Sequence, residues 1–194
     1  MNSTFGPEWL HEAMIETGAL LEGHFLLTSG LHSGSYMQCA LLLRMPRYAA
    51  RAGEALAELL RPLNPDFVVA PALGGLIIGH EVARALDVPF LFCERQEGVM
   101  TLRRFPHPGN KRFVAVEDVV TTGGSVREVG EAVAAGGAEW AGTACIVDRS
   151  AGKASFPHPL SSLMATSFPV YSPEECPLCK QGLPLVKPGS RKVS

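Results

Sequence analysis

Two adjacent carboxylates, followed by hydroxyls and glycines, form the stretch of this chain best suited to chemistry. Residues 113–125 read FVAVEDVVTTGGS. The glycine loop precedes a predicted helix, so unpaired backbone N–H groups and the positive end of the helix dipole meet there, where glycines let an anion approach closely. The hydroxyls of Thr121, Thr122 and Ser125 can donate to the same anion. The pattern predicts a binding site for a phosphate monoester.

Glu117 and Asp118 need a partner other than the phosphate, because charges of the same sign repel each other. Vicinal ribose hydroxyls, or a magnesium ion held by the acids, would be suitable. A sugar phosphate therefore fits both halves of the stretch. The alternative is that the acids only face solvent at a strand end and the threonines cap a helix. The glycines in register with them favour the binding site.

Composition and other motifs exclude several classes of protein. The 194 residues carry a formal net charge of −2, so no global positive field is expected to attract nucleic acid. The sequence lacks both the GxxxxGK[ST] and the GxGxxG nucleotide motifs. No apolar run approaches the length of a membrane span, and the N-terminus lacks a charged-then-apolar signal. We therefore expect a cytoplasmic protein without membrane or nucleic-acid partners.

Helical and strand patterns alternate along the chain. Apolar spacing predicts helices over 7–21, 46–60 and 125–135, and a strand, glycine turn and helix over 66–86. Nearly continuous apolar runs predict buried strands at 88–95, 112–118 and 140–150. Residues 23–43 are interpreted as strand, irregular turn, strand. The alternation predicts an α/β fold with a mainly parallel sheet covered on both faces.

The cysteines give a weaker signal. Cys39, Cys93 and Cys145 lie in apolar segments, where a free thiol behaves as a small hydrophobic side chain. Cys176 and Cys179 have the spacing of half a zinc knuckle, but the tail has no second pair of Cys or His at suitable spacing. The interpretation favoured here is a capped turn with reduced thiols rather than a metal site.

Residues 113–125 resemble, over their whole length, the 5-phosphoribosyl 1-pyrophosphate (PRPP) signature of type I phosphoribosyltransferases. The resemblance implies that the hydroxyl and glycine loop binds the 5-phosphate, that the acids bind the ribose hydroxyls, and that Mg2+ is held mainly by PRPP, with the two acids as candidate ligands. It also implies one domain over 1–194, with a core at about 46–150 and a hood over the base site from 18–45 and part of 151–190. The implied PRPP-binding residues are Glu117, Asp118, Val119, Val120, Thr121, Thr122, Gly123, Gly124 and Ser125.

Residues 18–150 further resemble the bacterial orotate phosphoribosyltransferase family. The resemblance implies that Tyr36, Met37, Thr121 and Arg149 contact orotate. Arg149 also makes independent physical sense, since a guanidinium is the best partner for the orotate carboxylate. The alternative is a surface arginine paired with Asp148.

The turn PALGG resembles the pyrophosphate loop of the family, formed here by Ala72, Leu73, Gly74 and Gly75. The resemblance implies a cis peptide bond between Ala72 and Leu73. The alternative is a helix entry whose glycines allow close packing. Gly74 departs from the lysine that many family members have at this position.

The resemblance also implies a lid over residues 96–111 that covers the site of a neighbouring subunit in a homodimer. Arg95 matches the opening arginine of that loop, but the family's lysine and histidine pattern is absent. Arg103 and Arg104 are the best substitutes as catalytic cations, ahead of Lys111 and His107. All could instead be solvated loop charges. A third departure is Thr28, which stands where the family has a lysine that contacts the base.

The implied reaction is attack of orotate N1 on C1 of PRPP, giving orotidine 5'-monophosphate and pyrophosphate, a step of UMP biosynthesis. Its transition state resembles a ribosyl oxocarbenium ion, and no covalent nucleophile is required. Two alternatives stay open: a purine phosphoribosyltransferase, which Arg149 disfavours, and a regulator that senses PRPP without turnover.

Overall fold

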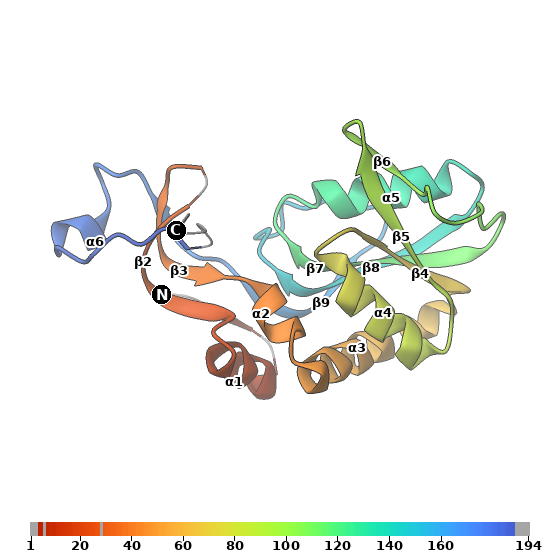
Figure 1. Ribbon diagram of the computed structural model, residues 1–194, viewed down its shortest axis with the longest axis horizontal. Helices are drawn as coiled ribbons and strands as arrows, with labels where there is room; N and C mark the ends of the chain where they lie inside the picture. The colour runs from red at the N-terminus through yellow and green to blue at the C-terminus, as the bar shows by residue number, and fades with distance from the viewer. Residues whose placement is uncertain (1–3, 6, 28, 189–194) are drawn as a thin grey trace, which may run out of the picture.

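The computed structural model describes residues 4–5, 7–27 and 29–188. Its core is a seven-stranded sheet in the order β1-β9-β8-β7-β4-β5-β6 (Figure 1). All neighbouring strands from β9 to β5 are parallel, and the edge strands β1 and β6 pair antiparallel. The predicted α/β class with a mainly parallel sheet is confirmed. The strands are β1 (Thr4–Phe5), β4 (Phe67–Pro71), β5 (Phe90–Gln96), β6 (Val99–Thr101), β7 (Arg112–Val120), β8 (Glu139–Asp148) and β9 (Leu160–Thr166).

Both faces of this sheet are buried, which explains its continuous apolar runs. Side chains alternate across a strand. Val68, Val114 and Ile146 belong to the cluster that includes α3 (Pro46–Leu60) and α4 (Gly75–Leu86). Their neighbours Val69, Ala115 and Cys145 pack with α5 (Gly124–Ala134). Figure 1 shows α5 on one side of the sheet and α3 with α4 on the other.

The hood is a separate three-stranded antiparallel sheet in the order β10-β3-β2, beside the core (Figure 1). It joins the beginning of the chain to its end, because β10 lies about 130 residues after β3. Within the described residues, no helix is both long and apolar enough to cross a membrane. The hood strands are β2 (Leu20–Leu26), β3 (His32–Met37) and β10 (Val170–Tyr171), and the remaining helices are α1 (Glu8–Glu16), α2 (Cys39–Leu43), the 3-10 turn η1 (Arg61–Leu63) and α6 (Pro177–Lys180).

Two sequence interpretations were wrong in detail. The run after Met37 forms α2 rather than a strand; it buries Cys39, Leu42 and Leu43 on one side, as a helix does. The first helix ends at Glu16 instead of residue 21, because Gly18 adopts the left-handed conformation (φ 71°) and the chain then enters β2. Strands β1, β6, β9 and β10 were not anticipated.

The parallel order places three loops at one edge of the sheet. Strands β8, β7 and β4 are neighbours, so their carboxyl ends meet. The segments that follow these ends are Arg149 after β8, residues 121–123 after β7 and residues 72–74 after β4. Ligands of open parallel sheets bind at this edge.

Helices α3 and α4 pack very closely, and this contact positions α4, the helix that follows residues 72–74. Gly53 on α3 lies so near α4 that a Cβ atom there would be 2.5 Å from Glu81 Cβ and 2.7 Å from the Glu81 carbonyl carbon. A Cβ atom essentially never lies this close to an atom that is not bonded to it, so only glycine at position 53 permits the two helices to cross here. Because α4 begins at Gly75, the crossing also positions the preceding loop.

We expect Gly53→Ala to destabilise the protein by about 1–3 kcal/mol, the usual range for overpacking. Alanine favours a helix by up to about 1 kcal/mol over glycine, but the clash with α4 backbone outweighs this gain. Thermal unfolding measures the difference, at about 2–4 °C per kcal/mol for a chain of this size. The control on the same helix is Glu58→Ala, which removes only an exposed ion pair with Arg61. Equal melting temperatures of the two variants would contradict the prediction.

Candidate active site

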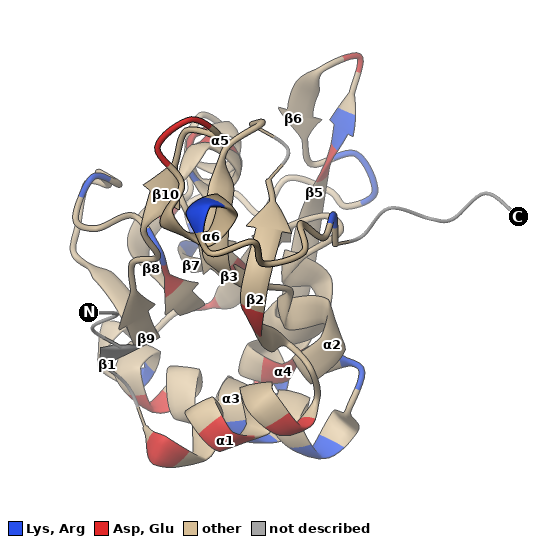
Figure 2. Ribbon diagram, turned by 90° about the vertical axis from the view of Figure 1, so that its left-hand side faces the viewer, with Lys and Arg blue, Asp and Glu red and all other residues tan. Residues whose placement is uncertain are grey.

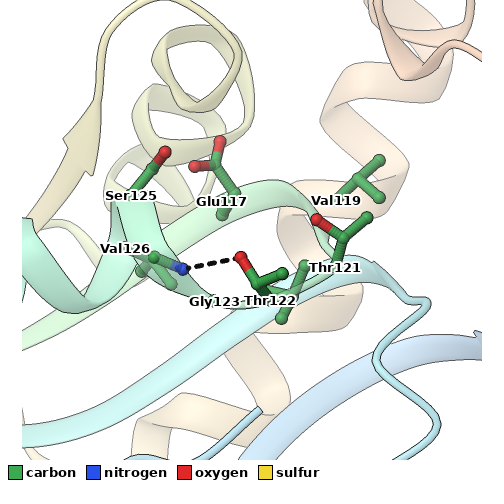
Figure 3. Close-up of a pocket in the computed structure, with 9 residues that line it drawn as sticks. Glu117, Val119, Thr121, Thr122, Gly123, Ser125 and Val126 are labelled. Carbon is green, nitrogen blue, oxygen red and sulfur yellow. Dashed lines mark hydrogen bonds between the residues drawn. The ribbon is translucent and has the colours of Figure 1, made fainter. Parts of the chain in front are cut away.

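The hydroxyl and glycine loop forms a pocket at the end of β7. Strand β7 continues to Val120, two residues further than predicted, and α5 begins at Gly124. Gly123 between them has φ 75°, and a Cβ atom there would lie 2.8 Å from the Phe156 ring. Glycine is therefore required at 123 by both conformation and space. Figure 3 shows the pocket, which is lined by Glu117, Val119, Val120, Thr121, Thr122, Gly123, Gly124, Ser125 and Val126.

The first turn of α5 supplies the donors of this pocket. The Arg127 N–H donates to the Gly123 carbonyl oxygen at 3.0 Å and so begins the helical ladder. The preceding amides of the turn have no partner within the helix, as at every helix start. The Gly124 N–H lies 3.4 Å from Thr122 Oγ1, and the hydroxyls of Thr122 and Ser125 are exposed (Figure 3). The structure thus brings together in one pocket the amides and hydroxyls for which the sequence analysis predicted a phosphate.

Arg127 is a residue of this site that sequence reasoning missed. Its guanidinium donates to the carbonyl oxygens of Thr122 and Ser155, both at 3.3 Å, and lies 5.9 Å from the Phe156 ring centre. Arg127 therefore connects the loop at the end of β7 to the segment that follows β8. No periodicity or motif marks this role, because it depends on Ser155, which lies 28 residues later in the chain and is brought close only by the fold.

Glu117, which is buried, and Asp118, which is half-buried, lie at the same end of the sheet. Glu117 is 8 % exposed and accepts the Asp118 N–H at 3.2 Å, while Asp118 accepts the Val119 N–H at 2.8 Å. None of the ion pairs among the described residues includes either acid. Burial, and then the neighbouring Asp118, raises the pKa of Glu117 to about 9, and burial also raises the pKa of Asp118. Two negative charges at these positions are therefore unfavourable unless a ligand with hydrogen-bond donors or positive charge binds to them.

The loop after β4 meets these acids. A Cβ atom on Gly74 would lie 2.9 Å from Asp118 Oδ1 and 3.3 Å from Glu117 Oε1. The peptide bond between Ala72 and Leu73 is cis, which confirms that prediction, and the Leu73 side chain is 82 % exposed. Gly74 of this loop therefore lies beside acids that follow it by more than forty positions in the chain.

Arg149 begins where β8 ends, next to the phosphate loop. Its N–H donates to the Val120 carbonyl oxygen at 2.8 Å. Its side chain is half-buried and stacks over Phe168 at 5.1 Å, and among the described residues its Nε has no hydrogen-bond partner. Burial lowers its pKa. Asp148 instead accepts the Ser150 N–H at 2.8 Å, so the alternative of an Arg149–Asp148 surface pair is not what the structure has.

The hood residues predicted to contact the base lie on β3, close to this arginine. Tyr36 is half-buried, packs against Phe25 with ring centres 5.9 Å apart, and is near enough to Arg149 to affect the pKa of that guanidinium. Met37 is only 7 % exposed and belongs to the core cluster. Thr121 is exposed at the loop. Thr28 lies outside the described residues.

The predicted lid cations do not line this pocket. Arg95 pairs with Glu128 at 2.7 Å, and Arg103 and Arg104 pair with Glu94 at 3.1 and 3.2 Å, all near the β5–β6 edge of the sheet. Strand β4 lies between that edge and β7. His107 packs closely against Gly136, and Lys111 lies beside a hollow under Phe105.

We expect Glu117→Gln to raise the melting temperature of the ligand-free protein at mildly alkaline pH. The pKa of Glu117 is about 9 in the folded protein and about 4.3 in an unfolded chain. Between these values the folded state retains a proton that the unfolded state releases, so the free energy of unfolding falls as pH rises. The variant lacks this penalty. Melting curves from about pH 5 to pH 9 measure the slope, with the exposed Glu12→Gln as control; parallel curves for wild type and Glu117→Gln would contradict the assignment.

Comparisons with known proteins agree with this geometry. Residues 40–155 match the phosphoribosyl transferase domain. The orotate phosphoribosyltransferase of Thermotoga petrophila is 53 % identical over 184 residues, covering 94 % of this chain and 98 % of that protein. That of Carboxydothermus hydrogenoformans is 50 % identical over 186 residues, covering 94 % and 97 %.

Solved structures share the fold at lower identity. The Mycobacterium tuberculosis H37Rv orotate phosphoribosyltransferase in complex with inorganic phosphate has a TM-score of 0.68 at 23 % identity, over 82 % of this chain and 96 % of that one. Adenine phosphoribosyltransferase from Thermoanaerobacter pseudethanolicus reaches 0.56 at 17 % identity, over 66 % and 87 %. These structural similarities show the type I phosphoribosyltransferase fold. The relatives at 50 % identity or more show which family within that fold the chain belongs to. The chain belongs to the orotate phosphoribosyltransferases of the phosphoribosyl transferase family.

Proposed function

We propose that this enzyme transfers the 5-phosphoribosyl group of PRPP to N1 of orotate, giving orotidine 5'-monophosphate and pyrophosphate in pyrimidine biosynthesis. The single observation that carries the choice of base is Arg149. A half-buried guanidinium whose Nε has no hydrogen-bond partner among the described residues, beside the proposed sugar-phosphate loop, favours an anion. Orotate brings a carboxylate to that place, whereas a purine base has none.

PRPP is held by three neighbouring strand ends. The amides and hydroxyls of residues 121–125 take the 5-phosphate at the α5 N-terminus. Glu117 and Asp118 accept hydrogen bonds from the ribose hydroxyls. The loop of residues 72–75 takes the pyrophosphate, and its contact with the acids holds the two ends of the substrate in register.

The acids also fit a divalent cation. Two buried carboxylates with no cationic partner among the described residues are the oxygen donors that magnesium prefers. Glu117 and Asp118 would hold it together with PRPP. When bound, magnesium neutralises charge that develops on the leaving pyrophosphate.

The residues of the hood and of β8 position the base. Arg149 binds the orotate carboxylate, and Tyr36 on β3 covers the ring from the hood, while Met37 packs in the core behind it. Thr121 lies between the base and the ribose, because Val120 and Asp148 are paired neighbours in the sheet. Orotate N1 is then placed against C1 of the sugar, and bond breaking to pyrophosphate leaves a ribosyl oxocarbenium ion that the acids stabilise.

The lid completes the site from a second subunit. Arg95, Arg103 and Arg104 lie away from the pocket of their own chain, at an exposed edge. In a homodimer they would reach the partner's pyrophosphate, add positive charge and exclude water, which otherwise competes for the activated sugar.

We expect Arg149→Ala to lose orotate affinity while PRPP affinity stays near the wild-type value. Removing one member of a buried charge pair costs about 2–5 kcal/mol, so the KM for orotate should rise about 30-fold or more. Pyrophosphate release in the presence of orotate measures the KM, and equilibrium binding measures PRPP affinity. Arg61→Ala, which removes an exposed arginine from η1, is the control.

Three outcomes would contradict this assignment. Equal losses of orotate and PRPP affinity would mean that Arg149 only supports the fold. An unchanged KM for orotate would remove it from the base site. Faster pyrophosphate release by the wild-type enzyme with a purine than with orotate would favour the purine phosphoribosyltransferase.

The shared lid predicts that two inactive variants restore each other. A chain with Arg103→Ala and Arg104→Ala keeps an intact pocket, and a chain with Asp118→Asn keeps an intact lid. After equal mixing and subunit exchange, about half of the dimers are hybrids, each with one complete site. We therefore expect roughly a quarter of wild-type activity. If the lid served its own chain, the mixture would be as inactive as its components.

A further inference from the structure

The hood contains a cluster of two histidines and two cysteines that the reaction does not use. His24 lies on β2, His32 on β3, Cys176 directly before α6 and Cys179 within it. Their ligand atoms all lie within 4.8 Å of one another, and all but Cys179 are buried. Figure 2, which faces the hood, shows α6 in front of β2, β3 and β10. The histidines and the cysteines are about 150 residues apart in the chain. A pattern within the tail alone therefore does not reveal the histidine partners of Cys176 and Cys179.

Four of the six distances among the ligand atoms are close to those of a tetrahedral metal site, and the other two are within 4.8 Å. Zinc bound at about 2.3 Å to sulfur and about 2.0–2.1 Å to nitrogen places S and N ligands about 3.6 Å apart and two N ligands about 3.3 Å apart. In the hood, His24 Nε2 is 3.5 Å from Cys176 Sγ and 3.6 Å from Cys179 Sγ. His32 Nδ1 is 3.3 Å from Cys179 Sγ and 3.0 Å from His24 Nε2.

The imidazole ring of His24 has a hydrogen bond on the side that faces away from the cluster, and this bond orients the ring for metal binding. His24 Nδ1 lies 2.8 Å from the Leu183 carbonyl oxygen. A carbonyl can only accept, so Nδ1 carries the proton and Nε2 presents its lone pair to the cluster. Metal-bound histidines nearly always make such a bond, which fixes the ring and its tautomer.

A metal ion at this place would hold Cys176 and Cys179 as thiolates, because it deprotonates coordinating thiols outright. Two thiolates with two imidazoles in a closed tetrahedral set are the ligands of structural zinc sites.

We propose that His24, His32, Cys176 and Cys179 bind one zinc ion, which fastens the C-terminal segment to the β2–β3 hairpin. Leu178, between the cysteines, packs near Gly34 of β3, where an added Cβ atom would be 3.8 Å from Leu178 Cδ1. The segment is otherwise joined to β2 by backbone bonds of Val186 to His24 and Leu26, both 2.8 Å. The zinc would thus hold the hood strand that carries Tyr36, without contacting substrate.

Metal analysis of the full-length protein tests this proposal. Protein purified in reducing buffer and then equilibrated with zinc sulfate, followed by gel filtration, should retain about one zinc ion per chain. Cys179→Ser, at the exposed corner of the cluster, and His32→Gln should retain well under half of that amount. Cys93→Ala, which removes a buried cysteine of the core, is the control and should keep the zinc.

Two further measurements do not depend on enzyme activity. A strong chelator should lower the melting temperature of the wild type and leave that of Cys179→Ser unchanged. Cobalt bound in place of zinc should show the intense visible bands of tetrahedral thiolate coordination, and these should be lost in Cys179→Ser. PRPP should still raise the melting temperature of Cys179→Ser, since the phosphate loop lies in the core.

Several results would overturn the proposal. Wild-type protein that takes up no zinc under these conditions rejects it, as does equal zinc retention by wild type and both ligand variants. A disulfide between Cys176 and Cys179 in freshly purified protein, seen as a loss of two hydrogen masses without bound metal, would assign the cysteines to redox chemistry instead.

Discussion

The burial of two adjacent carboxylates is the constraint on which the site depends. Glu117 and Asp118 sit at a strand end where burial raises the pKa of each, so the free protein holds an unfavourable pair. The proposed ligand, with vicinal hydroxyls and a divalent cation, would relieve that cost and would be bound more tightly for this reason. The same constraint explains Gly74: a side chain there, just before α4, would press on the carboxylates, as the 2.9 Å approach to Asp118 Oδ1 shows.

The core sheet and the hood sheet differ in how firmly packing holds them. The core sheet is buried on both faces and its helices cross closely, so the ends of β4, β7 and β8 are held in fixed register. The hood has only three strands, two of them from a hairpin and one from the far end of the chain. So small a sheet buries little apolar surface. A cross-link between its first and last segments is the usual remedy in small structural units.

The sequence was most informative where local chemistry and structure coincide. The apolar runs of β4, β7 and β8 and the helix of residues 46–60 follow from periodicity alone, and residues 113–125 carry a pattern specific to one ligand. Strand β9 was missed because serines interrupt its apolar residues, and β10 because it is only two residues long. The partners of Cys176 and the role of Arg127 could not be found, since both depend on contacts between segments that only the fold brings together.

The arginines of the proposed lid are held only weakly where they lie in their own chain. Arg95, Arg103 and Arg104 are paired with Glu94 and Glu128, and each of these arginine side chains is about half exposed. Exposed pairs of this kind contribute about 0–1 kcal/mol, so exchanging them for another anion costs little. In the proposed mechanism pyrophosphate brings several negative charges to a site that excludes water, where attraction would be stronger than at the surface. A weakly held guanidinium would leave its glutamate when the substrate is present and return when the product dissociates, which suits the proposed lid, since a lid opens once in every turnover.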